Sequence, residues 1–188
     1  MTSYGFLLFD DAEELDFVGP WEVITASSML RVRDGTDPDT AVMIAETDSP
    51  VRCAKGMVVL PHHSIDDHPP LDVIVVPGGQ GTRVEIDNET LLAWLGTTGP
   101  LATWVTSVCT GSLLLVGAGL ATNKRVATHW SFEDTLAERG DCTVVRDARW
   151  VRDGNVVTSQ GVSAGIDMAL WLIGQIHNPA HARAVQRY

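Results

Sequence analysis

Short apolar runs rich in β-branched residues alternate along this chain with longer segments of helical periodicity. The clearest runs, at 5–9, 72–76 and 104–108, are continuous rather than alternating, which is typical of strands buried on both faces of a sheet. Such a sheet must be covered by helices on both sides. The pattern therefore predicts an α/β fold with a doubly wound, mostly parallel central sheet.

Weaker apolar runs and turn residues predict the remaining elements. Further strands are expected at 40–45, 57–60, 126–128, 143–145, and in a hairpin that pairs 150–151 with 155–158 across Asp153-Gly154. Helices are expected from Gly19-Pro20 to about Met29, with Pro20 at the first helical position, and at 89–95, 131–139, 164–175 and after Asn178-Pro179. Without a repeat or long linker, we expect one domain spanning residues 1–188.

The charge balance excludes two classes of partner. The 188 residues include 13 Lys and Arg against 24 Asp and Glu, a formal net charge of −11 at pH 7. Phosphate backbones and anionic lipid headgroups would be repelled, so we expect no nucleic acid and no membrane partner. Three cysteines cannot all pair within the chain, and the first residues lack the pattern of a signal peptide, which favours the cytoplasm.

The most informative segment for chemistry is 103–114, where a predicted strand leads into small residues and then a helix. Cys109 stands at this turn, at the carboxyl edge of the sheet where open α/β folds bind ligands. A helix N-terminus lowers the pKa of a nearby thiol, so we expect Cys109 to be a nucleophilic thiolate on a strained turn. Cys53 and Cys142 lack this setting and are interpreted as structural.

A glycine pair follows the neighbouring predicted strand at 72–76. The backbone N–H groups of Gly78 and Gly79 could complete an oxyanion hole with that of Thr110. An ordinary turn between strand and helix is the alternative interpretation.

Asp16 is the candidate proton donor. Its apolar neighbours would draw the carboxyl group inward, where burial raises its pKa toward neutrality. The alternative is an aspartate that caps a helix. We expect Phe17, Trp21 and Val162 to give the site an apolar lining, and His129 to line the same cleft.

A histidine-rich loop offers a second chemical possibility. His62, His63 and His68 lie near Asp66 and Asp67, but in a proline-rich segment without helical i,i+4 spacing. We therefore expect a solvated loop and no metal site.

Five blocks of the sequence resemble the ThiJ/PfpI superfamily, within the flavodoxin-like, class I glutamine amidotransferase-like fold. They occur in family order, at 5–20, 71–79, 105–111, 127–130 and 161–167. The blocks around Asp16, Cys109 and His129 are most similar to the isocyanide hydratase branch. They also resemble the sensor halves of AraC-type transcription regulators.

This resemblance implies roles for named residues. Cys109 matches the family's nucleophile, Asp16 its acid/base carboxylate, and Thr110 the following residue, whose hydroxyl would orient Asp16 or water. Gly78 and Gly79 match the turn beside the oxyanion site. The implied reaction adds water to an organic isocyanide, giving an N-substituted formamide through a thioimidate on the cysteine, without a cofactor. The implied assembly is a homodimer.

The sequence departs from two other branches of the superfamily. Protease-like members carry histidine directly after the nucleophile, where this chain has Thr110. Chaperone- and glyoxalase-type members carry a glutamate where this chain has the shorter Asp16. A cysteine-based oxidative-stress sensor, a glyoxalase- or chaperone-type protein and a non-enzymatic ligand-binding domain remain as alternatives to the hydratase.

Overall fold

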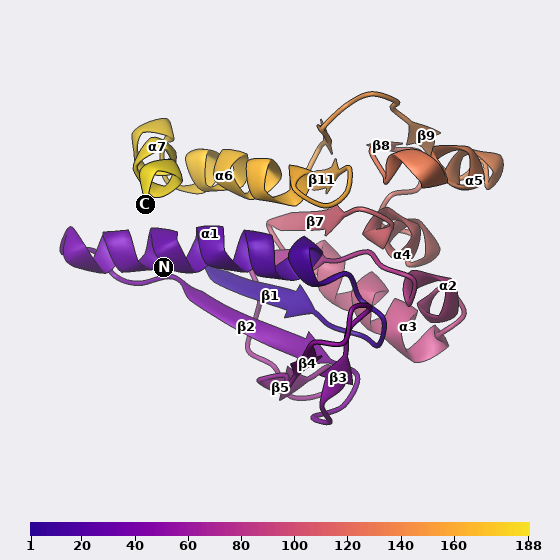
Figure 1. The fold of residues 1–188 in the computed structure, drawn as a ribbon, viewed down its shortest axis with the longest axis horizontal. Coiled ribbons are helices and arrows are strands. Elements are labelled where there is room, and N and C mark those ends of the chain that lie inside the picture. Colours follow the sequence, from indigo (N-terminus) through magenta and orange to yellow (C-terminus); the bar gives the residue numbers. More distant parts are fainter.

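A seven-stranded sheet forms the centre of the molecule in the computed structural model, which describes residues 1–188 (Figure 1). Its order is β10-β11-β7-β6-β1-β2-β5, and every neighbouring pair is parallel except β10 and β11. The parallel order β2-β1-β6-β7-β11 is that of flavodoxin-like folds. The predicted fold class is confirmed.

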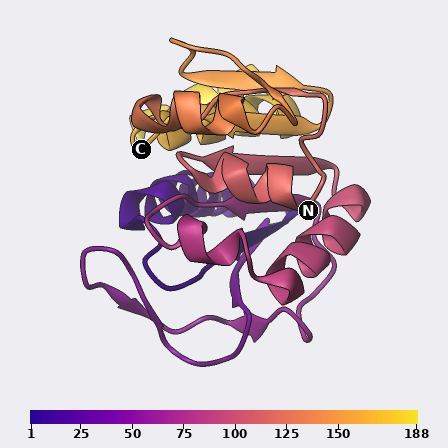
Figure 2. The same cartoon turned by 90° about the vertical axis from the view of Figure 1, so that its right-hand side faces the viewer.

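The strands of this sheet are β1 (Ser3–Leu7), β2 (Thr40–Ala45), β5 (His63–Ser64), β6 (Val73–Val76), β7 (Trp104–Val108), β10 (Trp150–Asp153) and β11 (Val156–Ser159). Two small sheets pair β3 (Val51–Arg52) with β4 (Val58–Val59), and β8 (Arg125–Val126) with β9 (Thr143–Val144). The β10–β11 pair is the predicted hairpin, and Gly154 takes the positive φ, 66°, that its turn requires. Figure 2 shows the β10–β11 hairpin (orange) at one end of the sheet and the segment from β2 to β5 (purple) at the other.

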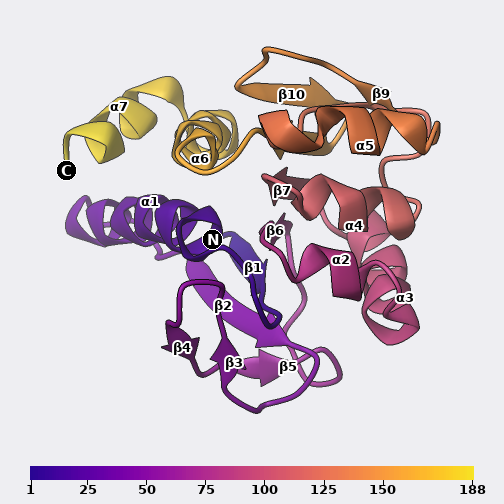
Figure 3. The same cartoon turned by 45° about the vertical axis from the view of Figure 1, so that its right-hand side comes forward.

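Helices cover both faces of the sheet (Figure 3). One layer contains α1 (Glu14–Arg33), α6 (Ala164–Ile176) and α7 (Pro179–Arg187). The other contains α2 (Thr82–Glu85), α3 (Glu89–Thr98), α4 (Gly111–Gly117), α5 (Glu133–Glu138) and the 3₁₀ turns Gly99–Leu101 and Trp130–Phe132. Asn88 and Asn178 accept hydrogen bonds at the starts of α3 and α7, as the helix signals predict. No helix is long and apolar enough to span a bilayer.

Two cores result from the alternation of side chains along the strands. On β6, Val73 and Val75 pack toward α1 and α6, whereas Ile74 and Val76 pack toward α3 and α4. All four side chains are almost completely buried. This two-sided burial is the reason that the strand is a continuous apolar run.

The predicted start of the first helix is wrong. The helix begins at Glu14, so Pro20 lies inside α1 and not at its first position. The Gly19-Pro20 pair has a packing role instead, because a Cβ at Gly19 would lie 2.8 Å from Ile166 of α6. The pair permits a close approach of α1 to α6, and the earlier start places Asp16 in the first turn of α1.

Candidate active site

Cys109 occupies the turn between β7 and α4. Its backbone adopts a φ of 56°, which is unfavourable for a residue with a side chain, and its amide donates to Ser159 O at 3.1 Å. The residue is only 7% exposed. The predicted strained strand-to-helix turn is therefore present, with Thr110 as the residue that precedes the helix.

Asp16 lies beside this thiol although the two residues belong to distant parts of the chain. Its side chain is fully buried, and the Gly78 amide donates to its Oδ2 atom at 3.0 Å. Burial raises the pKa of Asp16 to about 7, against the opposing effects of the Gly78 N–H and the Cys109 thiol. The Oδ1 atom has no hydrogen-bond partner.

The expected lowering of the Cys109 pKa does not occur. Burial and the nearby Asp16 carboxylate raise the pKa of Cys109 to about 12, although the Thr110 N–H and hydroxyl act in the opposite direction. The sulfur lies beside a carboxylate and not beside a cation. The effect of this environment on the Cys109 pKa is larger than that of the N-terminus of the short helix α4. Burial and the Asp16 carboxylate thus favour the thiol over the thiolate.

The two glycines do not leave their amides free for an oxyanion. The Gly78 amide donates to Asp16, and the Gly79 amide donates to the Thr110 hydroxyl at 3.1 Å. Both donors are thus engaged within the protein. The Thr110 hydroxyl in turn donates to Gly79 O at 3.2 Å, so it holds the glycine turn and does not orient Asp16.

A cavity of about 160 Å³ opens onto the sulfur. The predicted site residues Cys109, Thr110, Gly79, His129 and Val162 line it. Its other lining residues are Glu13, Ala54, Gln80, Arg83 and Ser131. Asp16 and Gly78 are not among its lining residues, and the fully buried Asp16 side chain interacts with the Cys109 thiol that lines it.

Phe17 and Trp21 do not line this cavity, contrary to the prediction. Phe17 is completely buried in the core between the sheet and α1. Trp21 packs edge-on against Phe6, with ring centroids 5.3 Å apart, and stacks on His62 at 5.8 Å. The helical phase of α1 turns both rings away from the thiol, which leaves a more polar lining than we expected.

Sequence reasoning missed Arg83, at the start of α2. Its Nη1 atom donates to Gly79 O at 2.8 Å and to the hydroxyls of Thr82 and Thr110 at 3.1 and 3.2 Å. Its guanidinium lies 4.6 Å from the centroid of the Phe132 ring. A basic residue shortly after the end of a central strand is a signal that could have identified it, because such turns face ligands.

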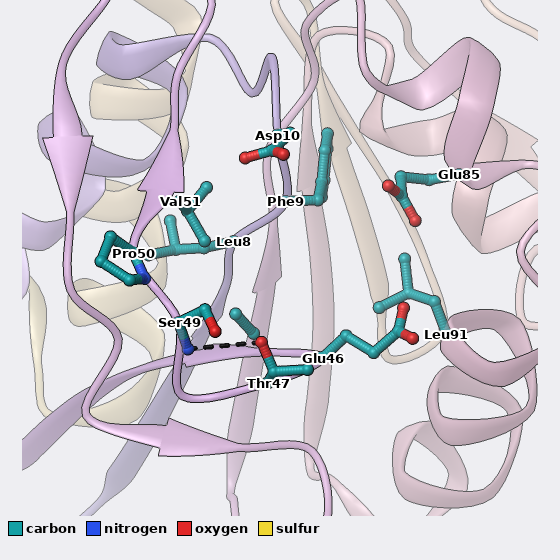
Figure 4. A pocket seen from close by; sticks show the side chains of 11 residues that line it. Leu8, Phe9, Asp10, Glu46, Thr47, Ser49, Pro50, Val51, Glu85 and Leu91 are labelled. Carbon is teal, nitrogen blue, oxygen red and sulfur yellow. Dashed lines mark hydrogen bonds between the residues drawn. The ribbon is translucent and has the colours of Figure 1, made fainter.

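A second cavity, of about 250 Å³, lies beyond the ends of β1 and β2 and has no cysteine in its lining (Figure 4). Its acidic residues are Asp10, Glu46 and Glu85. Asn88 donates to both glutamates, and the Arg52 amide donates to Asp10. These groups already have protein partners, so we place the active site at the thiol. No group of three or more His, Cys, Asp or Glu residues is arranged to hold a metal ion.

Comparison with known proteins identifies the family. The model of the DJ-1/PfpI family matches residues 3–175. The chain belongs to this family. It is 40% identical over 183 residues to a Pseudomonas putida protein named isonitrile hydratase, and the match covers 97% of this chain and 75% of that protein. The predicted superfamily is confirmed.

Two further comparisons bear on the fold and on the alternatives. A crystal structure of a ThiJ/PfpI family protein from Pseudomonas syringae superposes with a TM-score of 0.88 at 29% identity, covering 98% of this chain and 73% of that one. The transcriptional regulator GbdR of Pseudomonas aeruginosa is 26% identical over 97% of this chain but only 49% of the regulator. The resemblance to part of a regulator is therefore also present.

Proposed function

We propose that this protein hydrates an organic isocyanide to an N-substituted formamide. The observation that carries the proposal is the buried pair of Cys109 thiol and Asp16 carboxyl, in which Asp16 Oδ1 lacks a partner. Each of the two groups shifts the pKa of the other, so they lie close together. The 40% identity to a protein named isonitrile hydratase supports the same reaction.

In the first step the S–H group of Cys109 adds to the terminal carbon of the isocyanide. Cys109 Sγ forms a bond to that carbon while its proton passes to the Asp16 carboxylate. Asp16 then delivers this proton to the same carbon, which yields a neutral thioimidate on Cys109. A carboxyl group with a pKa of about 7 suits both transfers, because it accepts and releases a proton near neutral pH.

In the second step water displaces Cys109 from the thioimidate carbon. Asp16 accepts a proton from water as the oxygen attacks the thioimidate carbon, and it passes this proton to the nitrogen. The tetrahedral species then expels Cys109 as its hydroxyl proton passes through Asp16 to the sulfur, and the formamide is released. The sum is isocyanide plus water to formamide, with thiol and carboxyl group regenerated and no cofactor consumed.

Negative charge develops on the Cys109 sulfur as its proton leaves, and this charge must be stabilised. The Thr110 N–H lowers the Cys109 pKa, so it stabilises negative charge on the sulfur. Thr110 is held in turn by Gly79 and Arg83. We assign Thr110 this role in place of the orientation of water.

Turnover of an alkyl isocyanide, followed as formamide by mass spectrometry, tests the function. We expect Cys109→Ala to abolish turnover, and Asp16→Asn to reduce it by at least ~10²-fold because the proton relay is lost. Cys53→Ala is the matched control, since Cys53 lies in a separate part of the core. Turnover that persists in Cys109→Ala would refute the mechanism.

The same preparation examines the sensor alternative. A peroxide sensor requires a thiolate at rest, and burial opposes ionisation of Cys109. We therefore expect peroxide to oxidise Cys109 slowly in comparison with the turnover of isocyanide. Rapid oxidation without hydration would favour the sensor.

We also propose a homodimer in the cytoplasm, as the family resemblance implies. Met29 and Val32 on α1 are apolar and more than half exposed, which fits a surface covered by a second copy. Light scattering coupled to size-exclusion chromatography measures the oligomeric state directly.

A further inference from the structure

We propose that Arg83 selects isocyanides that carry a carboxylate group, an inference that rests on the proposed hydratase function. Arg83 and Cys109 line the same cavity of about 160 Å³. A substrate bonded to the sulfur therefore has only a short distance over which its substituent can extend before it meets the guanidinium.

The Arg83 side chain is exposed, and one nitrogen of its guanidinium is anchored to the protein. Its Nη1 atom makes all three of its hydrogen bonds to the protein, to Gly79 O, Thr82 Oγ1 and Thr110 Oγ1. The Phe132 ring packs against its plane at 4.6 Å. These contacts fix the orientation of the fork and leave the Nε and Nη2 hydrogens available to an anion.

The charge of Arg83 is not neutralised by the protein. No carboxylate lies within ion-pair distance of it, although acids outnumber bases in this chain by 24 to 13. The one acidic residue of the cavity, Glu13, is paired with the Lys55 ammonium. The cavity thus retains one uncompensated positive charge, which favours an anionic ligand.

The rest of the lining fits a small polar substituent. Gln80, Ser131 and His129 add hydrogen-bonding groups, and only Ala54 and Val162 contribute aliphatic side chains. An arginine fork binds a planar carboxylate with two parallel hydrogen bonds, so carboxylate is the class of substituent that this wall recognises best.

A matched pair of substrates tests the proposal. Isocyanoacetate and its methyl ester differ in charge at the substituent and share the reacting carbon. We expect the wild type to have a kcat/KM at least about tenfold higher for the anion, because a charge-assisted hydrogen bond is lost with the ester. Arg83→Gln should remove this preference, and Arg83→Lys should retain part of it through its charge. Arg125→Gln, an exposed arginine outside the cavity, is the control and should keep the wild-type ratio.

A second measurement does not depend on hydration. Iodoacetate and iodoacetamide alkylate the same sulfur and differ mainly in charge, so the ratio of their rates at Cys109 reports attraction of a carboxylate into the cavity. Changes in the reactivity of the thiol cancel in this ratio. We expect the ratio to fall about tenfold in Arg83→Gln relative to the wild type, as measured by mass spectrometry of the Cys109 peptide.

The outcomes separate the two proposals. Absence of any isocyanide turnover together with a lowered alkylation ratio in Arg83→Gln would reject the hydratase and retain the anion site. Equal turnover of acid and ester by the wild type would overturn the role of Arg83. A parallel loss of both substrates in Arg83→Gln, with an unchanged alkylation ratio, would overturn it as well, since it would mean that Arg83 only supports Thr110.

Discussion

At Asp16, the burial that favours the proposed proton transfer also lowers the stability of the folded protein when the carboxyl group ionises. Its carboxyl group is completely buried, and its pKa in the folded protein is about 7, well above the ordinary value of 3.8. Between these two pH values the folded state binds more protons than the unfolded state. The folded protein therefore gains stability at low pH that is lost progressively as the pH rises through about 7.

Replacement of Asp16 by asparagine should remove the cost of ionising a buried carboxyl group. Asparagine can still accept the Gly78 hydrogen bond but does not ionise, so we expect the free energy of unfolding to exceed that of the wild type by about 2–4 kcal/mol at pH 8. Near pH 4 the two proteins should be equally stable. Urea unfolding at the two pH values measures the difference, with the exposed Asp67→Asn as control. An equal difference at both pH values would contradict the assigned ionisation.

At the level of elements, the site depends on how closely the end of β6 approaches the turn after β7. A Cβ on Gly78 would lie 2.5 Å from Thr110 N and 2.7 Å from the Cβ of Cys109. No side chain fits there without movement of the backbone that carries the nucleophile.

We therefore expect Gly78→Ala to reduce kcat/KM by about 10²-fold, since displacement by an ångström at a reacting centre has effects of this size. Gly174→Ala is the matched control, because a Cβ at that position in α6 would meet Ala182 at 3.5 Å and Pro179 at 3.9 Å, both ordinary contacts. The control should retain activity and be slightly more stable, as alanine favours a helix more than glycine does. A Gly78→Ala enzyme with turnover close to that of the wild type would show that the close approach is dispensable.

Local sequence predicts a helix or strand well where its bounds depend on that segment alone. The strands Thr40–Ala45 and Trp104–Val108 have the predicted bounds, and the turn that carries Cys109 has the expected strained backbone. The start of α1 was misplaced, because the Gly19-Pro20 signal for a helix start also serves close packing against α6. That second use depends on a residue far along the chain and is invisible locally.

The candidate site shows the same division between local and long-range information. The inward position of Asp16 follows from its apolar neighbours, whereas its bond to the Gly78 amide depends on the pairing of β1 with β6. Sequence alone therefore assigned that amide to an oxyanion hole. The orientations of Phe17 and Trp21 and the contacts of Arg83 likewise depend on how whole elements pack.

On the scale of the whole molecule, Asp39 joins segments from both ends of the chain. Its buried carboxylate accepts from the Thr2 amide at 2.8 Å and lies 2.6 Å from His177 Nε2, at the end of α6. Arg31 of α1 lies 3.6 Å away. One side chain thus connects the first strand, the first helix and the C-terminal helices.

Removal of this carboxylate should destabilise the entire fold. We expect Asp39→Ala to lower the free energy of unfolding by about 3 kcal/mol, because partners of a buried ion are left without compensation. The nearby exposed Asp37→Ala should change it by less than about 0.5 kcal/mol. Equilibrium unfolding in urea gives both values. Equal effects of the two substitutions would show that the Asp39 contacts contribute nothing.

The acid and the thiol of the active site are supplied by separate regions of the chain, the first turn of α1 and the end of β7. They meet only when β1, β6 and β7 have paired in register. Neither half of the protein contains the proposed active site by itself, so the proposed turnover would depend on correct packing of the two halves. A ligand or solution condition that weakens the packing between these two regions would slow turnover without contacting either reacting group.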